Sequence, residues 1–238
     1  MIEIFAFALK GIGWVFLPAV LLPLAYMGWP EARQLKRICE ELITLIDGLS
    51  YWLGEFAKWA MPLLVISVAF SVFALSIFGL SWTKLSESAA YFHASTIMLG
   101  AAATLLAGQH VRVDIFHSRM SDRARARVDL AGFYILLLPV SLIILWNSQS
   151  FVNFGWRIFE GSNESDGIRG IYLLKTLIPI FCITMIAQAL SISLRAAMCL
   201  QGERRPPRPA HTPPLFPGLS GAKQNGPSQN SKTHKEAS

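Results

Sequence analysis

The sequence predicts an all-α integral membrane protein, and its composition and the placement of its charges support that fold class. Of the 238 residues, 53% are hydrophobic and only 15% are charged, whereas a soluble domain carries about 25% charged residues. The apolar residues form long uncharged blocks instead of following amphipathic spacing. The net charge of +6 lies at the flanks of these blocks, as juxtamembrane residues do, which argues against a nucleic-acid surface.

The central block, residues 88–111, lies between Glu87 and Arg112 and contains no charged residue. As a helix it would be about 36 Å long, enough to cross a hydrocarbon core of about 30 Å. It ends in a polar, basic run at 110–114. Small side chains recur along it, at Ala94, Ser95, Gly100, Ala101, Ala102, Ala103 and Gly108. Because small residues let helices approach closely, we expect this helix to pack tightly against another.

The first apolar block, residues 11–28, is either a retained membrane helix or a secretory signal peptide. It follows Lys10, contains Pro18 and Pro23, and is not closed by an Ala-x-Ala cleavage pattern. We therefore favour a retained helix.

Residues 31–58 predict an amphipathic helix that lies in the membrane surface or against a partner. Apolar residues recur there at steps of three and four, at Leu35, Ile38, Leu42, Leu45, Ile46, Leu49, Leu53 and Phe56. We expect the opposite, polar face to carry Arg33, Lys36, Arg37, Glu40, Glu41 and Asp47. Gly48 and Gly54 weaken the expectation that the helix is unbroken.

Three further blocks complete five expected spans, near residues 11–28, 59–82, 88–109, 130–151 and 174–197. The fourth helix is expected to end near Ser150, and Pro179 is placed in the first turn of the last, where its missing N–H costs little. Sixteen of the 21 Lys and Arg residues lie in 33–58, in 112–127 and from Arg195 to the C-terminus. The positive-inside rule then puts the N-terminus outside and the C-terminus in the cytoplasm.

Four regions follow from this division: an extra N-terminal span (1–30), the surface helix (31–58), a four-helix membrane domain (59–198) and a tail (199–238). The tail is rich in Pro, Ser and other polar residues and has no apolar period. We expect it to be disordered.

The spans carry none of the usual signs of catalysis or transport. The sequence has no phosphate loop, serine nucleophile elbow or His-Glu-x-x-His zinc motif. A cytochrome-like subunit needs two facing histidines on different helices, but His93 and His110 lie on one predicted helix. No acidic residue is expected at mid-membrane depth. We therefore expect a scaffold with no cofactor or metal and no enzymatic activity; the alternative is a membrane anchor subunit of a redox complex, cytochrome b-like.

Several motifs resemble the small permease subunit of tripartite ATP-independent periplasmic (TRAP) transporters, the DctQ-like family. They cover about residues 59–198, which leaves the 11–28 block as an addition to the four usual spans. The matching segments are ESAAYFH at 87–93, MLGAA at 98–102, HVRVD at 110–114, RMS at 119–121, DLAG at 129–132, LP at 138–139, ESDG at 164–167, LKTLIP at 174–179 and QALS at 188–191.

The resemblance implies a three-part importer of the bacterial inner membrane. In that family a periplasmic binding protein captures an organic acid or related solute, and a large permease subunit imports it by symport with a sodium gradient. The small subunit packs beside the large one, among membrane lipids. The motif residues that we expect at interfaces are Glu87, Tyr91, His93, Gly100, His110, Arg112, Asp114, Lys175 and Pro179.

Individual motif residues have local alternatives. Glu87 either caps its own helix N-terminus, where the dipole contributes about 0.3–1 kcal/mol, or contacts the binding protein. Gly100 is expected in a helix contact within the subunit, and Lys175 is expected to pair with Asp166 or Glu164. Asp114 pairs either with a partner or with a nearby arginine. The arginines from 112 to 127 set topology and meet anionic lipid.

Overall fold

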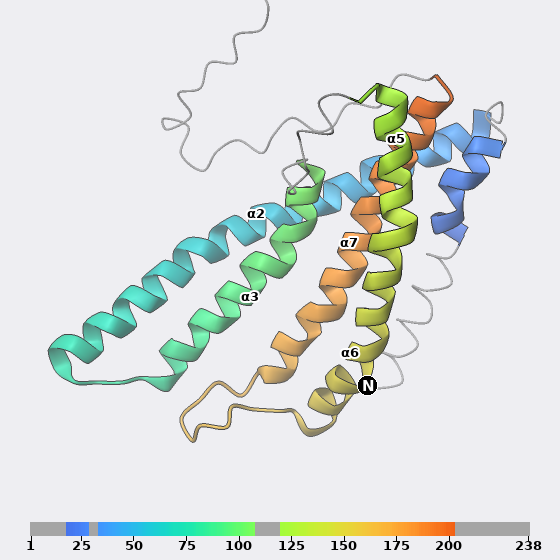
Figure 1. Ribbon diagram of the computed structural model, residues 1–238. Coiled ribbons are helices and arrows are strands. Elements are labelled where there is room, and N and C mark those ends of the chain that lie inside the picture. Colours follow the sequence, from blue (N-terminus) through green and yellow to red (C-terminus); the bar gives the residue numbers. More distant parts are fainter. Residues whose placement is uncertain (1–17, 29–32, 108–119, 203–238) are drawn as a thin grey trace, which may run out of the picture.

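A computed structural model describes residues 18–28, 33–107 and 120–202, and within these ranges the chain is helical with no strand. The all-α prediction is confirmed. The labelled elements of Figure 1 are α2 (Arg33–Phe78), α3 (Thr83–Leu106), α5 (Asp122–Ala131), the π-helical η1 (Gly132–Leu137), α6 (Leu138–Ile158) and α7 (Ile171–Leu200). A shorter apolar helix, Pro18–Gly28, precedes α2.

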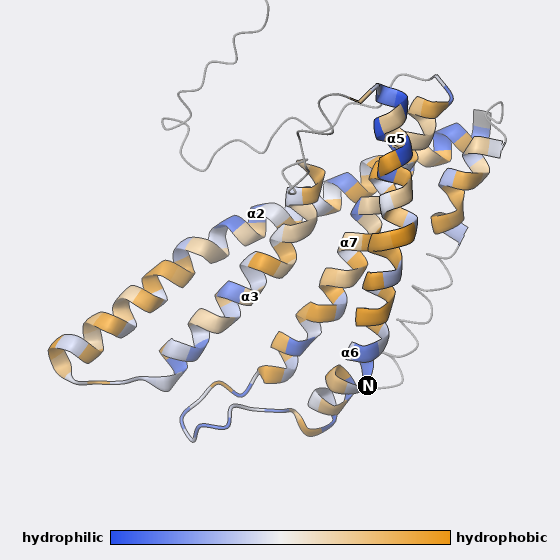
Figure 2. Ribbon diagram, in the orientation of Figure 1, coloured by the Kyte–Doolittle hydropathy of each residue, from blue (hydrophilic) through white to orange (hydrophobic). Residues whose placement is uncertain are grey.

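Four of the described helices are long and apolar enough to cross a membrane: Gln34–Phe78, Thr83–Leu106, Asp122–Ile158 and Ile171–Leu200. Figure 2 shows apolar residues along most of their length. Part of the first expected span, residues 11–17 of 11–28, lies outside the described residues. Its remainder packs on the bundle, where Tyr26 is buried and the Val20 carbonyl accepts a hydrogen bond from the Tyr134 hydroxyl at 2.6 Å.

The expected surface helix, residues 31–58, and the expected span at 59–82 form one continuous helix. α2 has 46 residues, which makes it about 69 Å long. Gly48 and Gly54 do not interrupt it, and Pro62 is accommodated inside it, although proline removes one backbone hydrogen bond. In Figure 1, α2 runs obliquely across the bundle, strongly inclined to α6 and α7.

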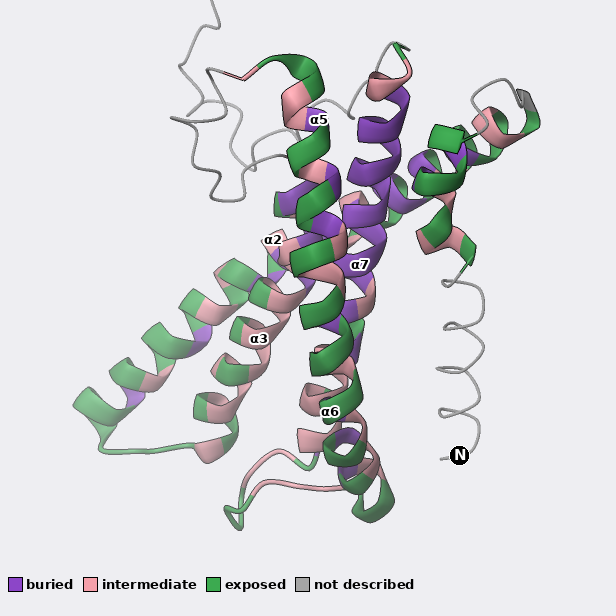
Figure 3. Cartoon of the chain, turned by 45° about the vertical axis from the view of Figure 1, so that its right-hand side comes forward, coloured by how far each residue is buried: buried purple, intermediate pink, exposed green. Residues whose placement is uncertain are grey.

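The centre of the bundle is α7, which contacts α2, α3, α5 and α6. From Thr184 to Met198 every residue of α7 is buried, and Figure 3 shows this half of the helix as the buried core of the molecule. Pro179 was predicted in the first turn of this helix, but that prediction is wrong because the helix begins at Ile171. Membrane helices tolerate internal proline when neighbouring groups satisfy the freed backbone carbonyl.

The helix from Asp122 to Ile158 continues past Ser150, where we expected it to end. It ends in Phe159, whose φ of 47° is left-handed and so closes the last turn as a C-terminal cap. The π-helical turn Gly132–Leu137 ends two residues before Pro139. Because Pro139 has no N–H, a local change of hydrogen-bond register before it allows the helix to continue.

Small residues bring α2 and α3 together, as the sequence predicted for Gly100. A Cβ added to Gly100 would lie 3.5 Å from the Ala57 Cβ, an ordinary contact. A Cβ added to Gly54 would lie only 2.5 Å from the Ala103 Cβ. The two helices can therefore pack closely at Gly54, because that position carries no side chain.

We predict that Gly54→Ala destabilises the protein by about 1–3 kcal/mol, because the new methyl group overpacks against Ala103. The matched control is Gly48→Ala on the same helix, where an added Cβ meets nothing within 4 Å. That change should be neutral or slightly stabilising, since alanine is the better helix former. Thermal unfolding in detergent measures both variants, and equal melting temperatures would contradict the close contact.

Candidate functional site

The most buried charges of the described residues form an ion pair between α2 and α7. Asp47 and Arg195 are 3% and 5% exposed, and the Arg195 Nη2 lies 2.5 Å from the Asp47 Oδ2. The second guanidinium nitrogen, Nη1, is 3.4 Å from the Asp47 Oδ1. Such two-point contact between guanidinium and carboxylate fixes orientation as well as distance.

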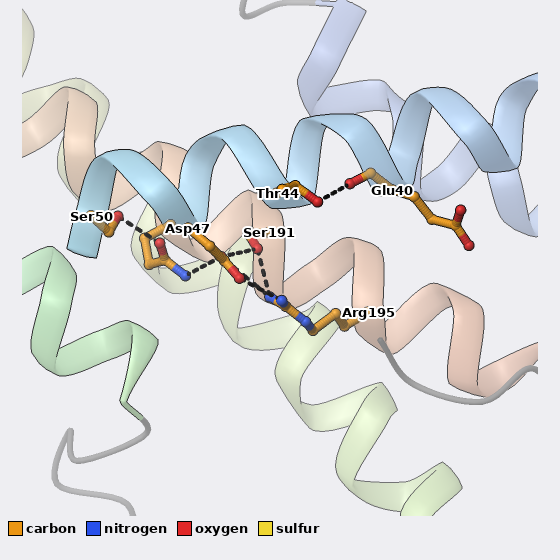
Figure 4. A network of polar contacts seen from close by, with 7 residues as sticks. Glu40, Thr44, Asp47, Ser50, Ser191 and Arg195 are labelled. Atoms are coloured by element: carbon orange, nitrogen blue, oxygen red, sulfur yellow. Dashed lines mark hydrogen bonds and ion pairs between the residues drawn. The ribbon is translucent and has the colours of Figure 1, made fainter. Parts of the chain in front are cut away.

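Three further polar side chains surround this pair (Figure 4). The Ser191 hydroxyl donates to the Asp47 Oδ1 at 2.8 Å and accepts from the Arg195 Nη1 at 2.7 Å. The Gln188 amide donates to the same Asp47 oxygen at 3.2 Å. Ser50, one turn along α2, donates to the Gln188 Oε1 at 2.6 Å. Together these five residues form a continuous buried network that links α2 to α7.

This network neutralises its own charges, so its role is to hold two helices in register. Removing two charges from water is costly unless each is paired and hydrogen-bonded, and here both Asp47 oxygens have donors. If α2 slid along α7, the ion pair between Asp47 and Arg195 would break and leave two buried charges unpaired. The pair therefore opposes sliding more strongly than apolar contacts alone would.

The prediction that Asp47 lies on the polar, exposed face of the amphipathic segment is wrong. Periodicity placed it beside charged neighbours such as Glu40, but the face that α2 turns towards α7 also includes Cys39, Ile43 and Ser50. One sequence signal pointed to the network. Gln188, Ser191 and Arg195 are spaced by three and four residues within an apolar helix, so they share one face.

A second polar cluster lies at the other end of α7, where the loop between α6 and α7 meets α3. Glu87 is the fifth residue of α3. Its carboxylate accepts a hydrogen bond from the Ile168 backbone amide at 2.6 Å and another from the Ser162 hydroxyl. The Ser162 hydroxyl oxygen also accepts a hydrogen bond from the Glu164 backbone amide at 3.1 Å. The backbone amide of Ser162 donates a hydrogen bond to the Ile168 carbonyl at 3.1 Å. Glu87 thus holds together the two sides of this loop.

The prediction that Glu87 caps the N-terminus of its own helix is wrong, whereas its contact with the binding protein stays a prediction. The N-cap of α3 is Trp82, and no side chain caps that end of the helix. The carboxylate instead satisfies a loop that follows it by about 80 residues. Sequence alone could not pair Glu87 with Ser162 and Ile168, because nothing in their spacing indicates that contact.

Lys175 has an acidic partner, although not the one expected. It forms an ion pair with Glu160, in which the two side chains are 10% and 26% exposed. Its Nζ also lies 3.8 Å from the centre of the Phe151 ring, a cation–π contact that offsets part of the lost hydration. Asp166, one of the predicted partners, pairs with Lys84 at 2.8 Å on the surface.

The remaining motif residues do not gather at one site. The Tyr91 hydroxyl is buried beside Gly170 and makes no hydrogen bond within the described residues. Pro179 is buried inside α7, whereas His93 is exposed on α3. His110, Arg112 and Asp114 lie outside the described residues. The described ranges contain no group of three or more His, Cys, Asp or Glu side chains that could hold a metal.

The fold and its polar clusters define a multi-pass membrane protein whose buried charges connect its own helices. The family model described as "Tripartite ATP-independent periplasmic transporters, DctQ component" matches residues 64–199, more than half of the chain. The chain therefore belongs to the DctQ family, the small permease component of TRAP transporters, which is a transporter family and not an enzyme family. Neither the curated proteins nor the solved structures contain a match.

We predict that Asp47→Leu destabilises the protein by about 3–5 kcal/mol, because it leaves a buried guanidinium without its counter-ion. The double variant Asp47→Leu/Arg195→Met should recover most of that loss, since two apolar side chains need no partner. A double-mutant cycle of unfolding free energies in detergent measures the coupling. Additive effects of the two changes would show that the pair does not connect α2 to α7.

We predict that Glu87→Ala loosens the loop from 159 to 170, because the Ile168 amide and the Ser162 hydroxyl lose their acceptor. Hydrogen exchange at the Ile168 amide should become faster, while amides in the middle of α7 keep their protection. Lys84→Ala is the control, since its ion pair with Asp166 is mostly exposed and contributes little. Equal exchange in the wild type and Glu87→Ala would mean that Glu87 does not hold the loop.

Proposed function

We propose that this protein is the small subunit that fixes the large permease of a TRAP transporter in the inner membrane. In this proposal the large subunit uses a sodium gradient to import an organic acid or related solute. A periplasmic binding protein delivers that solute. The present chain contributes a rigid membrane surface and takes no part in the transport chemistry.

The observation that carries the proposal is the DctQ match over 64–199, and the pairing of polar groups supports it. Two acidic residues of α2 have partners within the chain: Asp47 pairs with Arg195, and Glu55 with Lys58 at 2.6 Å. Glu87 binds the loop before α7. A substrate or ion pathway normally presents ionisable groups to a water-filled cavity, whereas these carboxylates connect one part of the scaffold to another.

The distribution of basic residues supports a C-terminus in the cytoplasm. Fifteen of the 21 basic residues lie in 33–58, 112–127 and 199–238. On this topology the loop held by Glu87 faces the periplasm. A cysteine introduced at Ser162 should then react with an impermeant reagent in intact cells, and one at Ser121 only after the membrane is opened; the reverse pattern would refute the topology.

We predict that sodium-driven uptake requires this chain together with the large subunit and the binding protein. In proteoliposomes the three components should accumulate solute, whereas this chain alone should transport nothing. Omitting the small subunit should lower uptake without changing the affinity of the binding protein for its solute, because that site lies on another polypeptide. Sodium-dependent uptake by this chain alone would refute the scaffold role.

A further inference from the structure

One face of α3 is exposed along the whole helix and is only weakly apolar. The exposed residues recur at steps of three, four and seven, at Ser86, Ala90, His93, Ile97 and Thr104. By contrast, the exposed side of α2 beyond Pro62 carries large apolar groups, among them Val65, Ile66, Phe70 and Phe73. The two exposed faces therefore differ in chemistry, although both belong to helices that can cross the membrane.

The length of α3 and the polar groups at its outer end indicate the depth of His93. The described helix has 24 residues and is about 36 Å long, so nearly all of it is needed to cross about 30 Å of hydrocarbon. His93 is its eleventh residue, with about 15 Å of helix before it and about 20 Å after it. Because the surface ion pair of Lys84 and the loop bound by Glu87 lie at the outer end of α3, the apolar part of the helix begins near Glu87, and His93 lies about 9 Å beyond it, inside the hydrocarbon core.

The imidazole has no hydrogen-bond partner in the part of the chain that the structure describes, and it is exposed there. Lipid tails offer no donor or acceptor, so a polar side chain facing them stays unsatisfied. Side chains such as histidine, at this depth, normally face another helix and hydrogen-bond across the contact. Contact with lipid tails is therefore unfavourable for the face of α3 that carries His93.

We propose that the exposed face of α3, at Ser86, Ala90, His93, Ile97 and Thr104, binds a transmembrane helix of the large permease subunit. This rests on the proposed function, which supplies a membrane partner, and it names the contact surface. The partner helix offers a hydrogen-bonding side chain or a freed carbonyl opposite His93. Ala90, one turn before His93, and Ser86, one turn before Ala90, let the two backbones approach closely.

The occupant is a different chain, because the interior face of α3 is already in use. Leu99, Ala102, Leu105 and Leu106 are buried, and Gly100 and Ala103 approach α2. In Figure 3, α3 is largely intermediate or exposed, whereas the adjoining half of α7 is buried. One side of α3 thus packs against the other helices of this chain, and the side that carries His93 stays available for the partner.

The first experiment compares two matched substitutions in the assembled transporter. Ala90→Trp places a bulky group on the α3 face, and Ala69→Trp places the same group on the exposed apolar side of α2. Both positions are exposed, so both variants should retain the wild-type melting temperature. Tagged small subunit is purified in mild detergent, and the large subunit recovered with it is measured. We expect Ala90→Trp to lower that recovery about tenfold and Ala69→Trp to leave it unchanged.

The second experiment tests the imidazole itself. His93→Leu should weaken the association by about threefold to tenfold, as loss of one interhelical hydrogen bond in a membrane would. His93→Gln keeps a donor and an acceptor and should restore much of the recovery. A photo-reactive residue at Ile97 should cross-link to the large subunit.

The outcomes separate this proposal from the proposed function. If wild-type protein retains the large subunit but Ala90→Trp and His93→Leu retain it equally well, the α3 face is not the contact and the scaffold role stands. Cross-linking only to lipid, or to a second copy of this chain, would also overturn the proposal. If wild-type protein retains no large subunit at all, the proposed function fails and this proposal fails with it.

Discussion

The ion pair between Asp47 and Arg195 is the constraint on which the arrangement of the bundle depends. Apolar contacts between membrane helices gain little over contacts with lipid, so they specify register weakly. A buried carboxylate and guanidinium specify it strongly, because separating them leaves two charges without partners. Gln188, Ser191 and Ser50 extend the pair into a network with directional bonds. The oblique crossing of α2 over α7 therefore has one favourable alignment.

The far end of α7 is connected by different chemistry. Glu87 accepts backbone and hydroxyl donors from the loop before α7, and Lys175 pairs with Glu160 at the start of that loop. Trp156 adds a hydrogen bond from its indole to Thr176 at 2.9 Å. Consequently α7 is connected to α2 near one end and to α3 and α6 near the other, with small-residue packing between.

Sequence reasoning located the elements well and their partners poorly. Uncharged blocks longer than about 18 residues reveal spans directly, and the small residues around Gly100 correctly indicated a close helix contact. Burial of Asp47 could not be predicted, because its counter-ion lies 148 residues away and helical periodicity alone gave it an exposed face. Glu87 and Lys175 were recognised as needing partners, but loop geometry decided which groups met them. The continuity of α2 was missed because residues 33–58 have an amphipathic pattern and the residues after them form an uncharged block, so the two were assigned to separate helices.

The length of α2 makes the ion pair a pivot. Asp47 lies about 21 Å from the first residue of the helix and about 46 Å from the last. A rigid helix that tilts about this point moves its far end roughly twice as far as its near end. Because α3 packs against the long arm through Gly54 and Ala103, both helices would swing as one unit. A small displacement of the shorter segment of α2, Arg33–Thr44, would thus produce a displacement about twice as large at the far end of the helix, as in a lever.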